Sequence, residues 1–443
     1  MSPFVLRKGR RFGLAALLRR TADVRPEEVT LVFWCWIYIF CVLSSYYVMR
    51  PIREQMGVAG GVANLPWLFT ATLAGMLVAN LPFALLVQRL PRSRFVPLVY
   101  RFFGLNILGF AAALHLSGPD QALWIGRAFF VWVSIYNLFV VSVFWQLNVD
   151  LFSPEQGRRL FGVISAGATI GAIFGSGITA GLARSVPPPL LLIAAAVLLE
   201  VAVLSASRLT RLSPASGDRR ASPSAGSADQ PVGGSSAIAG LTHAIRSPYL
   251  LGVSAFLLLF AITSTFLYFQ QAAIVAASFS DRGSQTAFFA TLDLCVNTVT
   301  LVIQLFVTGR VLGTLGIAVA LALLPGLTAL GFGVLAFAPT LATVAVFQVL
   351  RRSADYSIAR PAREVLFTVV PREDRYKAKA FIDTFVYRLG DQVGAWSMAL
   401  LGAISNAAGA LVAILLAIAW LINALWLGRQ QRSREKIAAE GLH

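Results

Sequence analysis

The sequence predicts an all-α membrane protein, and two features of the chain carry this prediction. Over 443 residues, 57% are hydrophobic, 13% are charged and the mean hydropathy is +0.73. This is more apolar surface than a soluble domain can bury. In addition, twelve mostly apolar windows recur along the chain, each with the roughly 18 or more residues that a helix needs to cross a hydrocarbon core of about 30 Å.

The twelve expected spans follow one another in order. They cover residues 29–50, 64–88, 95–117, 121–147, 160–183, 188–207, 248–270, 285–308, 311–337, 339–359, 378–402 and 406–428. Residues 1–28 are basic and lead through Pro26, Glu27 and Glu28 into a full-length span, so no cleavable signal is expected. The first helix is therefore expected to remain as an anchor.

Basic residues are distributed unevenly among the connections between the spans. Most lie in the N-terminal arm, the even-numbered connections and the C-terminal tail, whereas the odd-numbered connections have Arg53, Arg184 and Arg282 as their main basic residues. Because Lys and Arg accumulate on the cytoplasmic side, both termini are expected to be cytoplasmic in a multi-pass protein of a bacterial inner membrane. This asymmetry also accounts for most of the net charge of +17, so no nucleic-acid partner is expected.

The chain divides into two groups of six spans. Residues 211–240 are dominated by Ser, Ala, Gly and Pro without apolar periodicity, which is typical of a flexible linker. Two six-helix bundles related by an axis along the membrane normal form the major facilitator fold, which is the expected architecture. We expect a basic arm, an N-terminal bundle, a linker, a C-terminal bundle and a tail at 1–28, 29–207, 208–247, 248–428 and 429–443.

Small residues recur at four-residue spacing in the fifth span, at Gly167, Gly171 and Gly175. Small side chains at this spacing let helix backbones approach closely in lipid, so close helix packing rather than ligand contact is the expectation. The pairs Gly171-Ala172 and Gly394-Ala395 occupy corresponding spans of the two groups. This echo suggests that the two groups are related repeats.

The pentapeptide Arg-Pro-x-Arg-Glu occurs twice, at 50–54 and 360–364, each time at the end of an apolar run. A charged side chain at the centre of a membrane helix costs about 2.5–3.5 kcal/mol on insertion scales, so such residues tend to face a water-filled path or a polar partner. If the first helix continues past Pro51, one face carries Tyr46, Arg50, Arg53 and Glu54. A substrate path is the favoured interpretation, and the alternative is that these arginines snorkel at the outer mouth.

The second copy lies in a longer run of charge along the tenth span and its extension. One approximate helical face there carries Arg352, Tyr356, Arg360, Arg363 and Glu364. Lys377 and Lys379 follow, and the eleventh span then buries Asp383, Arg388 and Asp391. Salt bridges that lock a gate are an alternative role for these groups. In the eighth span Asp293 is a lone carboxylate, for which pairing with an arginine is favoured over ion coupling.

A cavity with surplus guanidinium and ammonium groups attracts anions, because Arg holds phosphate or carboxylate oxygens with two parallel hydrogen bonds and Lys supplies a compact charge. The sequence contains no phosphate-binding glycine loop of an ATPase, so transport is expected to be secondary. Cys35, Cys41 and Cys295 are scattered, as are the three histidines, so no metal and no cofactor are expected. No constellation of a nucleophile, metal or cofactor indicates an enzyme.

Several segments resemble the ATP/ADP translocases of plastids and obligate intracellular bacteria. They are the stretch from Tyr356 to Glu364, the run from Lys377 to Asp383, the Arg-Leu-Gly at 388–390, the Arg-Pro-x-Arg-Glu at 50–54 and the Phe-Trp…Asn at 144–148. The resemblance implies a nucleotide transporter of the major facilitator type with basic residues at Arg53, Arg363, Lys377 and Lys379. The chain departs from the family where a Lys-Ser-Gly-Gly segment is Asp391-Gln-Val-Gly394 and where a glutamate is replaced in the segment ending at Gln270-Gln271.

We therefore predict a secondary transporter of the lipid bilayer that moves nucleotides or another organic or phosphorylated anion, such as ATP or ADP, by alternating access. The alternatives are a major facilitator for an unrelated organic solute or drug, with the charges as gate ion pairs, and a membrane scaffold without transport. Nothing in the sequence sets the oligomeric state, and a monomer is compatible with this fold. The predicted substrate-binding residues are Tyr46, Arg50, Arg53, Glu54, Asn148, Tyr356, Arg360, Arg363, Glu364, Lys377, Lys379 and Arg388.

Overall fold

A computed structural model describes residues 24–212, 247–370, 378–379, 381–404 and 406–440. Within these ranges all regular secondary structure is helical, as the composition predicts. Most of the predicted N-terminal arm, most of the predicted linker and Lys377 lie outside the described residues.

The first half of the chain consists of six long helices. They are α2 (Val29–Ala59), α3 (Leu65–Arg89), α4 (Arg92–Leu116), α5 (Pro119–Leu151), α6 (Pro154–Leu182) and α7 (Pro188–Leu212), with a short 3-10 helix (Val62–Asn64) before α3. Pro at the first helical position and a capping box of Ser153 and Gln156 fix the start of α6.

The second half contains six further helical segments, three of which include π-helical turns. The three without π turns are α9 (Pro248–Ser278), α10 (Arg282–Phe306) and α17 (Asn406–Glu440). In the fourth, α11 (Thr308–Arg310) leads through a π turn (Val311–Leu315) into α12 (Gly316–Phe337), and in the fifth, α13 (Leu341–Ala354) leads through a π turn (Asp355–Ala359) into α14 (Arg360–Leu366). In the sixth, a π turn (Ile382–Val386) leads into α16 (Tyr387–Ile404).

Ten helices in the described ranges are long and apolar enough to cross a membrane. The tenth and eleventh expected spans are also present, as α13–α14 and the segment that ends in α16, but both contain π turns and several charges. The interruption explains why these two segments fall short of an unbroken apolar helix. The prediction of an all-helical, multi-pass membrane protein is confirmed.

Several helices extend beyond the predicted ends of their spans. The predicted end of the first span at residue 50 is wrong, because α2 continues through the buried Pro51 to Ala59. Pro51 removes one backbone donor, yet packing on several sides holds the helix together. Similarly, α7 continues to Leu212, and α17 continues to Glu440 through residues that were expected to form a separate tail.

The helix α2 is the centre of the first half and packs against α5, α6 and α7. At Gly171 and Gly175 an added Cβ would overlap the backbone carbonyls of Phe40 and Ser44. The predicted role of these glycines in close packing is therefore confirmed. In the second half, Gly394 of α16 contacts α9 in the same manner, which matches the echo between the two groups of spans.

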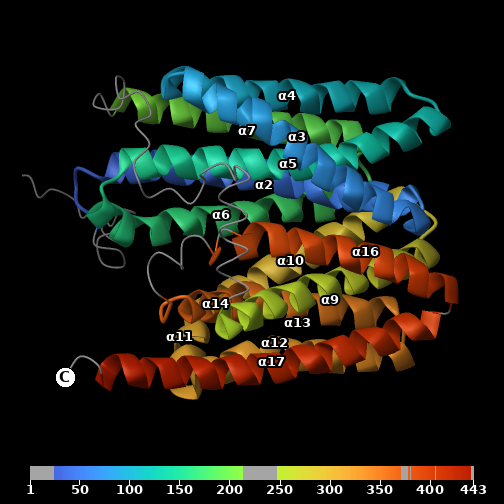
Figure 1. The fold of residues 1–443 in the computed structure, drawn as a ribbon. Helices are drawn as coiled ribbons and strands as arrows, with labels where there is room; N and C mark the ends of the chain where they lie inside the picture. The colour runs from blue at the N-terminus through green and yellow to red at the C-terminus, as the bar shows by residue number, and fades with distance from the viewer. Residues whose placement is uncertain (1–23, 213–246, 371–377, 380, 405, 441–443) are drawn as a thin grey trace, which may run out of the picture.

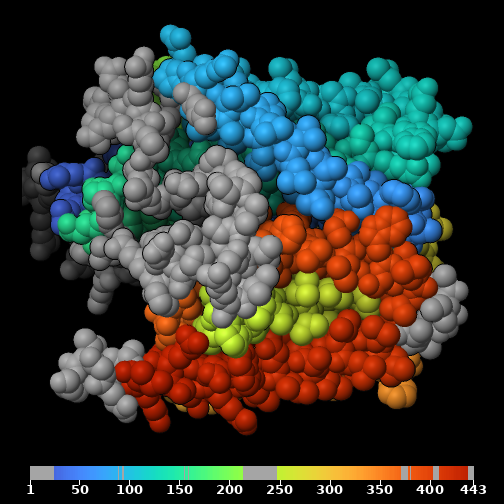
Figure 2. All heavy atoms as spheres, viewed as in Figure 1, coloured from blue at the N-terminus to red at the C-terminus, as the bar shows by residue number. Residues whose placement is uncertain are grey.

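The two halves lie side by side along their long axes (Figure 1). The boundary is formed where α10 packs on α2 and α6 and where α3 packs on α16. Figure 2 shows the contact of α3 with α16 on the visible face. We call the end where α2 begins and α17 ends the terminal end, and the opposite end the distal end. At the distal end an apolar cluster joins the halves, with Val58, Leu65, Leu68 and Phe130 from the first and Phe269, Ala272, Val275, Phe289 and Ala395 from the second.

Candidate functional site

A cavity of about 330 Å³ lies between the two halves, and its described walls come from α2, α3, α5, α9, α10, the α13–α14 segment and α16. Ten charged side chains of the described residues line it. They are Arg50, Arg53, Arg351, Arg352, Arg360, Arg388, Glu54, Asp293, Asp355 and Asp391. Six arginines against four carboxylates leave two positive charges, so the described lining has a positive surplus.

The first half contributes its charge to the cavity from one face of α2. Because α2 is regular through Pro51, Tyr46, Arg50 and Arg53 share this face, with Glu54 beside them. Arg53 pairs with Glu54 at 2.6 Å, donates from Nε to the Phe130 carbonyl at 3.1 Å and stacks 3.8 Å above the Phe130 ring. One guanidinium is thus held by its own helix and by α5.

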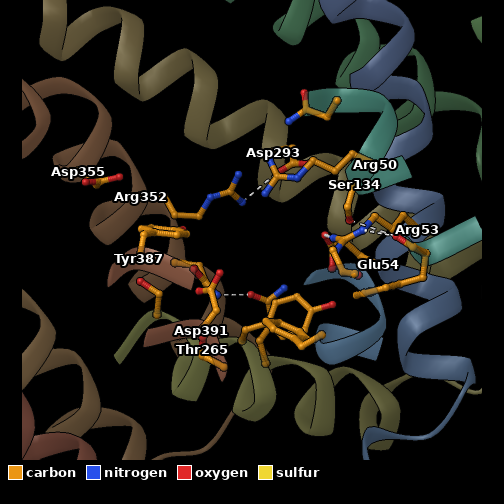
Figure 3. Close-up of a pocket in the computed structure, with 18 of the residues that line it drawn as sticks. Arg50, Arg53, Glu54, Ser134, Thr265, Asp293, Arg352, Asp355, Tyr387 and Asp391 are labelled. Carbon is orange, nitrogen blue, oxygen red and sulfur yellow. Dashed lines mark hydrogen bonds and ion pairs between the residues drawn. The ribbon is translucent and has the colours of Figure 1, made fainter. Parts of the chain in front are cut away.

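Asp293 on α10 lies between two arginines (Figure 3). Its Oδ1 accepts from Arg352 Nη1 at 2.8 Å and lies 3.2 Å from Arg50 Nη1. The Asp293 side chain is only 3% exposed. The expected pairing of this carboxylate with an arginine is confirmed, and the Arg50 pair crosses between the two halves.

Arg351 differs from the other arginines of the cavity because it pairs with no carboxylate among the described residues. Its guanidinium is buried and donates to Thr328 Oγ1, Thr263 Oγ1 and Ser264 Oγ at 2.8–3.3 Å. Neutral acceptors satisfy its hydrogen bonds without cancelling its charge. Arg351 therefore contributes to the positive surplus.

The remaining charges come from the segments that contain π turns. Asp355 and Tyr356 lie in the π turn, and Arg360 follows it, pairs with Asp355 at 3.1 Å and lies 4.4 Å from the centre of the Tyr356 ring. On α16, Arg388 pairs with Asp391 at 3.4 Å. π turns are rare in proteins overall, but those that occur are often found at functional sites. The extra residue in the turn redirects the side chains that follow it.

Seven of the twelve predicted site residues line the cavity, namely Tyr46, Arg50, Arg53, Glu54, Tyr356, Arg360 and Arg388. Arg363, Glu364 and Lys379 are not in its lining. They follow Arg360 toward the terminal end, where Lys379 pairs with Glu364 at 2.5 Å and Asp383 lies within electrostatic reach of Arg363. The π turn ends the simple helical face that grouped Arg363 and Glu364 with Arg352. Asn148 is fully buried and donates to the Phe144 carbonyl, and Lys377 lies outside the described residues.

Several polar residues of α9 line the cavity but were not among the predicted site residues. Ser264, Tyr268 and Gln271 face it together with Thr265, and Gln271 accepts a hydrogen bond from Gln348 of α13. The positions 264, 268 and 271 recur at helical spacing, so this face could have been found in the sequence. No such spacing indicates the contact of Gln392 on α16 with Thr70 on α3, which depends on how the halves meet.

Comparison with known proteins adds relatives of low identity that span nearly the whole chain. No family model matches the sequence. ADP,ATP carrier protein 1, chloroplastic, of Arabidopsis thaliana is 23% identical over 91% of this chain and 75% of that protein. ADP,ATP carrier protein 1 of Chlamydia muridarum is 21% identical over 91% of this chain and 88% of that protein. A solved bacterial homologue of the iron transporter ferroportin, in an inward-facing state, superposes with a TM-score of 0.65 at 9% identity, covering 90% of this chain and 99% of that one.

The helical architecture of two halves around a polar cavity is the fold of the major facilitator type. Among curated proteins, the chain is similar at low identity to ADP,ATP carrier proteins of plastids and Chlamydia. The resemblance predicted from a few charged segments is confirmed by matches that extend over 91% of the chain.

Proposed function

We propose that this protein moves nucleotides or related organic phosphates across the membrane by alternating access of its central cavity. The observation that carries the proposal is the set of six arginines against four carboxylates in the described lining of the cavity between the two halves. Guanidinium groups bind phosphate oxygens through two parallel hydrogen bonds, and they remain charged at any working pH.

The aromatic lining supports a cargo that combines a flat ring with phosphates. The ring centres of Phe69 and Tyr268 lie 5.5 Å apart in an edge-to-face arrangement, and the guanidinium of Arg53 stacks over the ring of Phe130. Aromatic rings stack on nucleobases whatever the base. The cavity of about 330 Å³ is within the range of small-molecule sites, which is about 300–1,000 Å³. The names of the related carrier proteins point to ADP and ATP as the first cargo to test.

The orientation and the outlying basic residues belong to the same proposal. We place the terminal end in the cytoplasm of a bacterium, because the basic connections gather there. Arg363 and Lys379 then form a basic approach to the cavity from the cytoplasmic side. The protein acts as a carrier without enzymatic chemistry.

A second candidate is a carrier for an unrelated organic solute in which the arginines serve as gate ion pairs. The pairing of five of the six arginines with carboxylates favours it. The two candidates differ in what they expect of charge, since a gate needs neutral pairs and an anion site needs the surplus that Arg351 supplies.

Proteoliposomes test the proposal directly. Vesicles that contain the purified chain and are loaded with unlabelled ADP should accumulate labelled ATP or ADP, and R53A should reduce uptake at least tenfold. R101A is the control, because Arg101 pairs with Glu200 on the exposed side of α4 and α7. Uptake of neither nucleotide, together with no rise in melting temperature across nucleotides and organic phosphates, would reject the proposal.

A further inference from the structure

We propose that Arg50 and Arg352 form a two-arginine clamp for a phosphate group of the cargo. The carboxylate of Asp293 occupies this clamp until the phosphate displaces it. The inference rests on the proposed function and adds the subsite that takes the phosphate, together with a residue that competes for it.

The first step is the geometry of the three side chains. A single oxygen, Oδ1 of Asp293, lies 2.8 Å from Arg352 Nη1 and 3.2 Å from Arg50 Nη1. Two guanidinium groups are therefore brought to one point by a carboxylate. A phosphate oxygen at that point would meet the same two donors, and its neighbouring oxygens could accept from the rest of each fork.

The second step is that the clamp has a hydrogen-bond donor to spare. Arg352 Nη2 is buried and has no hydrogen-bond partner among the described residues. The side chains of Arg50 and Arg352 are 18% and 14% exposed, and both line the cavity. A buried donor without a partner costs about 1–3 kcal/mol. A phosphate has more acceptor oxygens than a carboxylate and would satisfy this donor.

The third step is the contrast with the other carboxylates of the cavity. Within the described part of the chain, Glu54, Asp355 and Asp391 each pair with one arginine, on their own helix or segment. Only Asp293 among these four is shared by arginines of both halves, since Arg50 lies on α2 and Arg352 on α13. Cargo that displaces Asp293 would therefore replace a protein bridge between the halves with a bridge through itself.

The experiment compares nucleotide binding by three variants of the full-length protein in detergent. In calorimetric titration with ADP, D293N should bind about tenfold more tightly than the wild type, because the internal competitor has gone. D391N is the matched control. It also removes one negative charge from the cavity but frees a single arginine of the same helix, so its affinity should rise no more than about threefold.

A third variant guards against misfolding of D293N. D293E keeps the carboxylate, and its ADP affinity should remain within about threefold of the wild type. The clamp is rejected if D293N binds ADP no more tightly than D391N does, or if D293E matches D293N. If D293N cannot be purified, D293S takes its place with the same expected gain in ADP affinity, because it also removes the competing carboxylate. Absence of ADP and ATP binding in all forms, the wild type included, would reject the proposed function as well as the clamp.

Discussion

The two halves build their walls of the cavity in different ways. The first half supplies Arg50, Arg53 and Glu54 from one unbroken helix, which close glycine contacts attach to α6. The second half supplies most of the charge from segments with π turns, in which Asp355 and Tyr356 lie within the turn itself. One wall is regular and tightly packed, while the other is irregular and dense in charge.

This difference indicates that the two walls of the cavity have different roles. A π turn is a place where a helix can change its hydrogen bonding at low cost, because its geometry is already irregular. The packed α2–α6 pair cannot adapt in that way, since its backbones are in direct contact. We infer that the second half adjusts to cargo while the first half provides a fixed partner. Four predictions test this comparison.

The largest expected effect is the loss of either arm of the clamp. R50A removes the contribution of the fixed wall and R352A that of the adaptable one, and each should reduce nucleotide exchange about 100-fold or more. Truncating one partner of a buried charge pair costs about 2–5 kcal/mol, and each factor of ten corresponds to about 1.4 kcal/mol. Exchange in proteoliposomes measures both. If R50A were active and R352A inactive, the second half alone would bind the cargo.

A second prediction concerns the packing of the fixed wall. G171A should destabilise the protein by about 1–3 kcal/mol, because the new methyl group meets the Phe40 carbonyl, which belongs to a backbone and cannot swing aside. G181A lies on the same helix with open space at its Cβ position and should leave stability unchanged. Melting temperatures in detergent compare the two. Equal melting temperatures would show that α2 and α6 separate readily.

A third prediction concerns a contact at the start of the same two helices. Burial raises the pKa of the Glu28 carboxyl, but hydrogen bonds from the Arg25 backbone, Gln156 and Arg159 outweigh burial and lower the pKa below its ordinary value of 4.5. The ionised carboxylate therefore adds stability above pH 4.5, which is lost as the pH falls through the lowered pKa. E28Q should lower stability by about 1 kcal/mol at pH 7.

Thermal melts of wild type and E28Q at pH 7 and at values below 4.5 provide the measurement. The difference between the two proteins should shrink as the pH falls, and a constant difference would contradict the assignment. E27Q is the control, because the neighbouring Glu27 is exposed.

The smallest effect is expected at the terminal end of the adaptable wall. Glu364 and Lys379 form a pair whose side chains are 53% and 37% exposed. Exposed ion pairs contribute about 0.2–1 kcal/mol. E364Q should change melting temperature by less than G171A does and exchange by less than threefold. A loss of exchange comparable to that of R352A would instead place Glu364 in the cargo path.

Much of the fold could be predicted from the sequence, because burial in lipid demands long apolar helices and penalises charge. The same rule located Arg50, Arg53, Arg360 and Arg388 in the cavity, since each interrupts an apolar run. Glycine spacing predicted the approach of α6 to α2, because only small residues permit it. These inferences needed no knowledge of which helices are neighbours.

What could not be predicted depends on irregular geometry or on neighbours far away in the chain. A regular helical face grouped Arg363 with Arg352, but the π turn at Asp355–Ala359 changes the direction of the face between them. The neutral partners of Arg351 come from α9 and α12, which no local pattern connects to α13. The continuation of α2 through Pro51 likewise depends on the helices packed around it.

The apolar cluster that joins the halves at the distal end has a consequence for temperature. Parting that end exposes Phe130, Phe269 and Phe289 to water, which raises the heat capacity of the parted state. Apolar association weakens on cooling, so cold weakens the contact between the halves at the distal end. Warmth strengthens the same contact, so the two halves should be harder to part at the distal end at higher temperature.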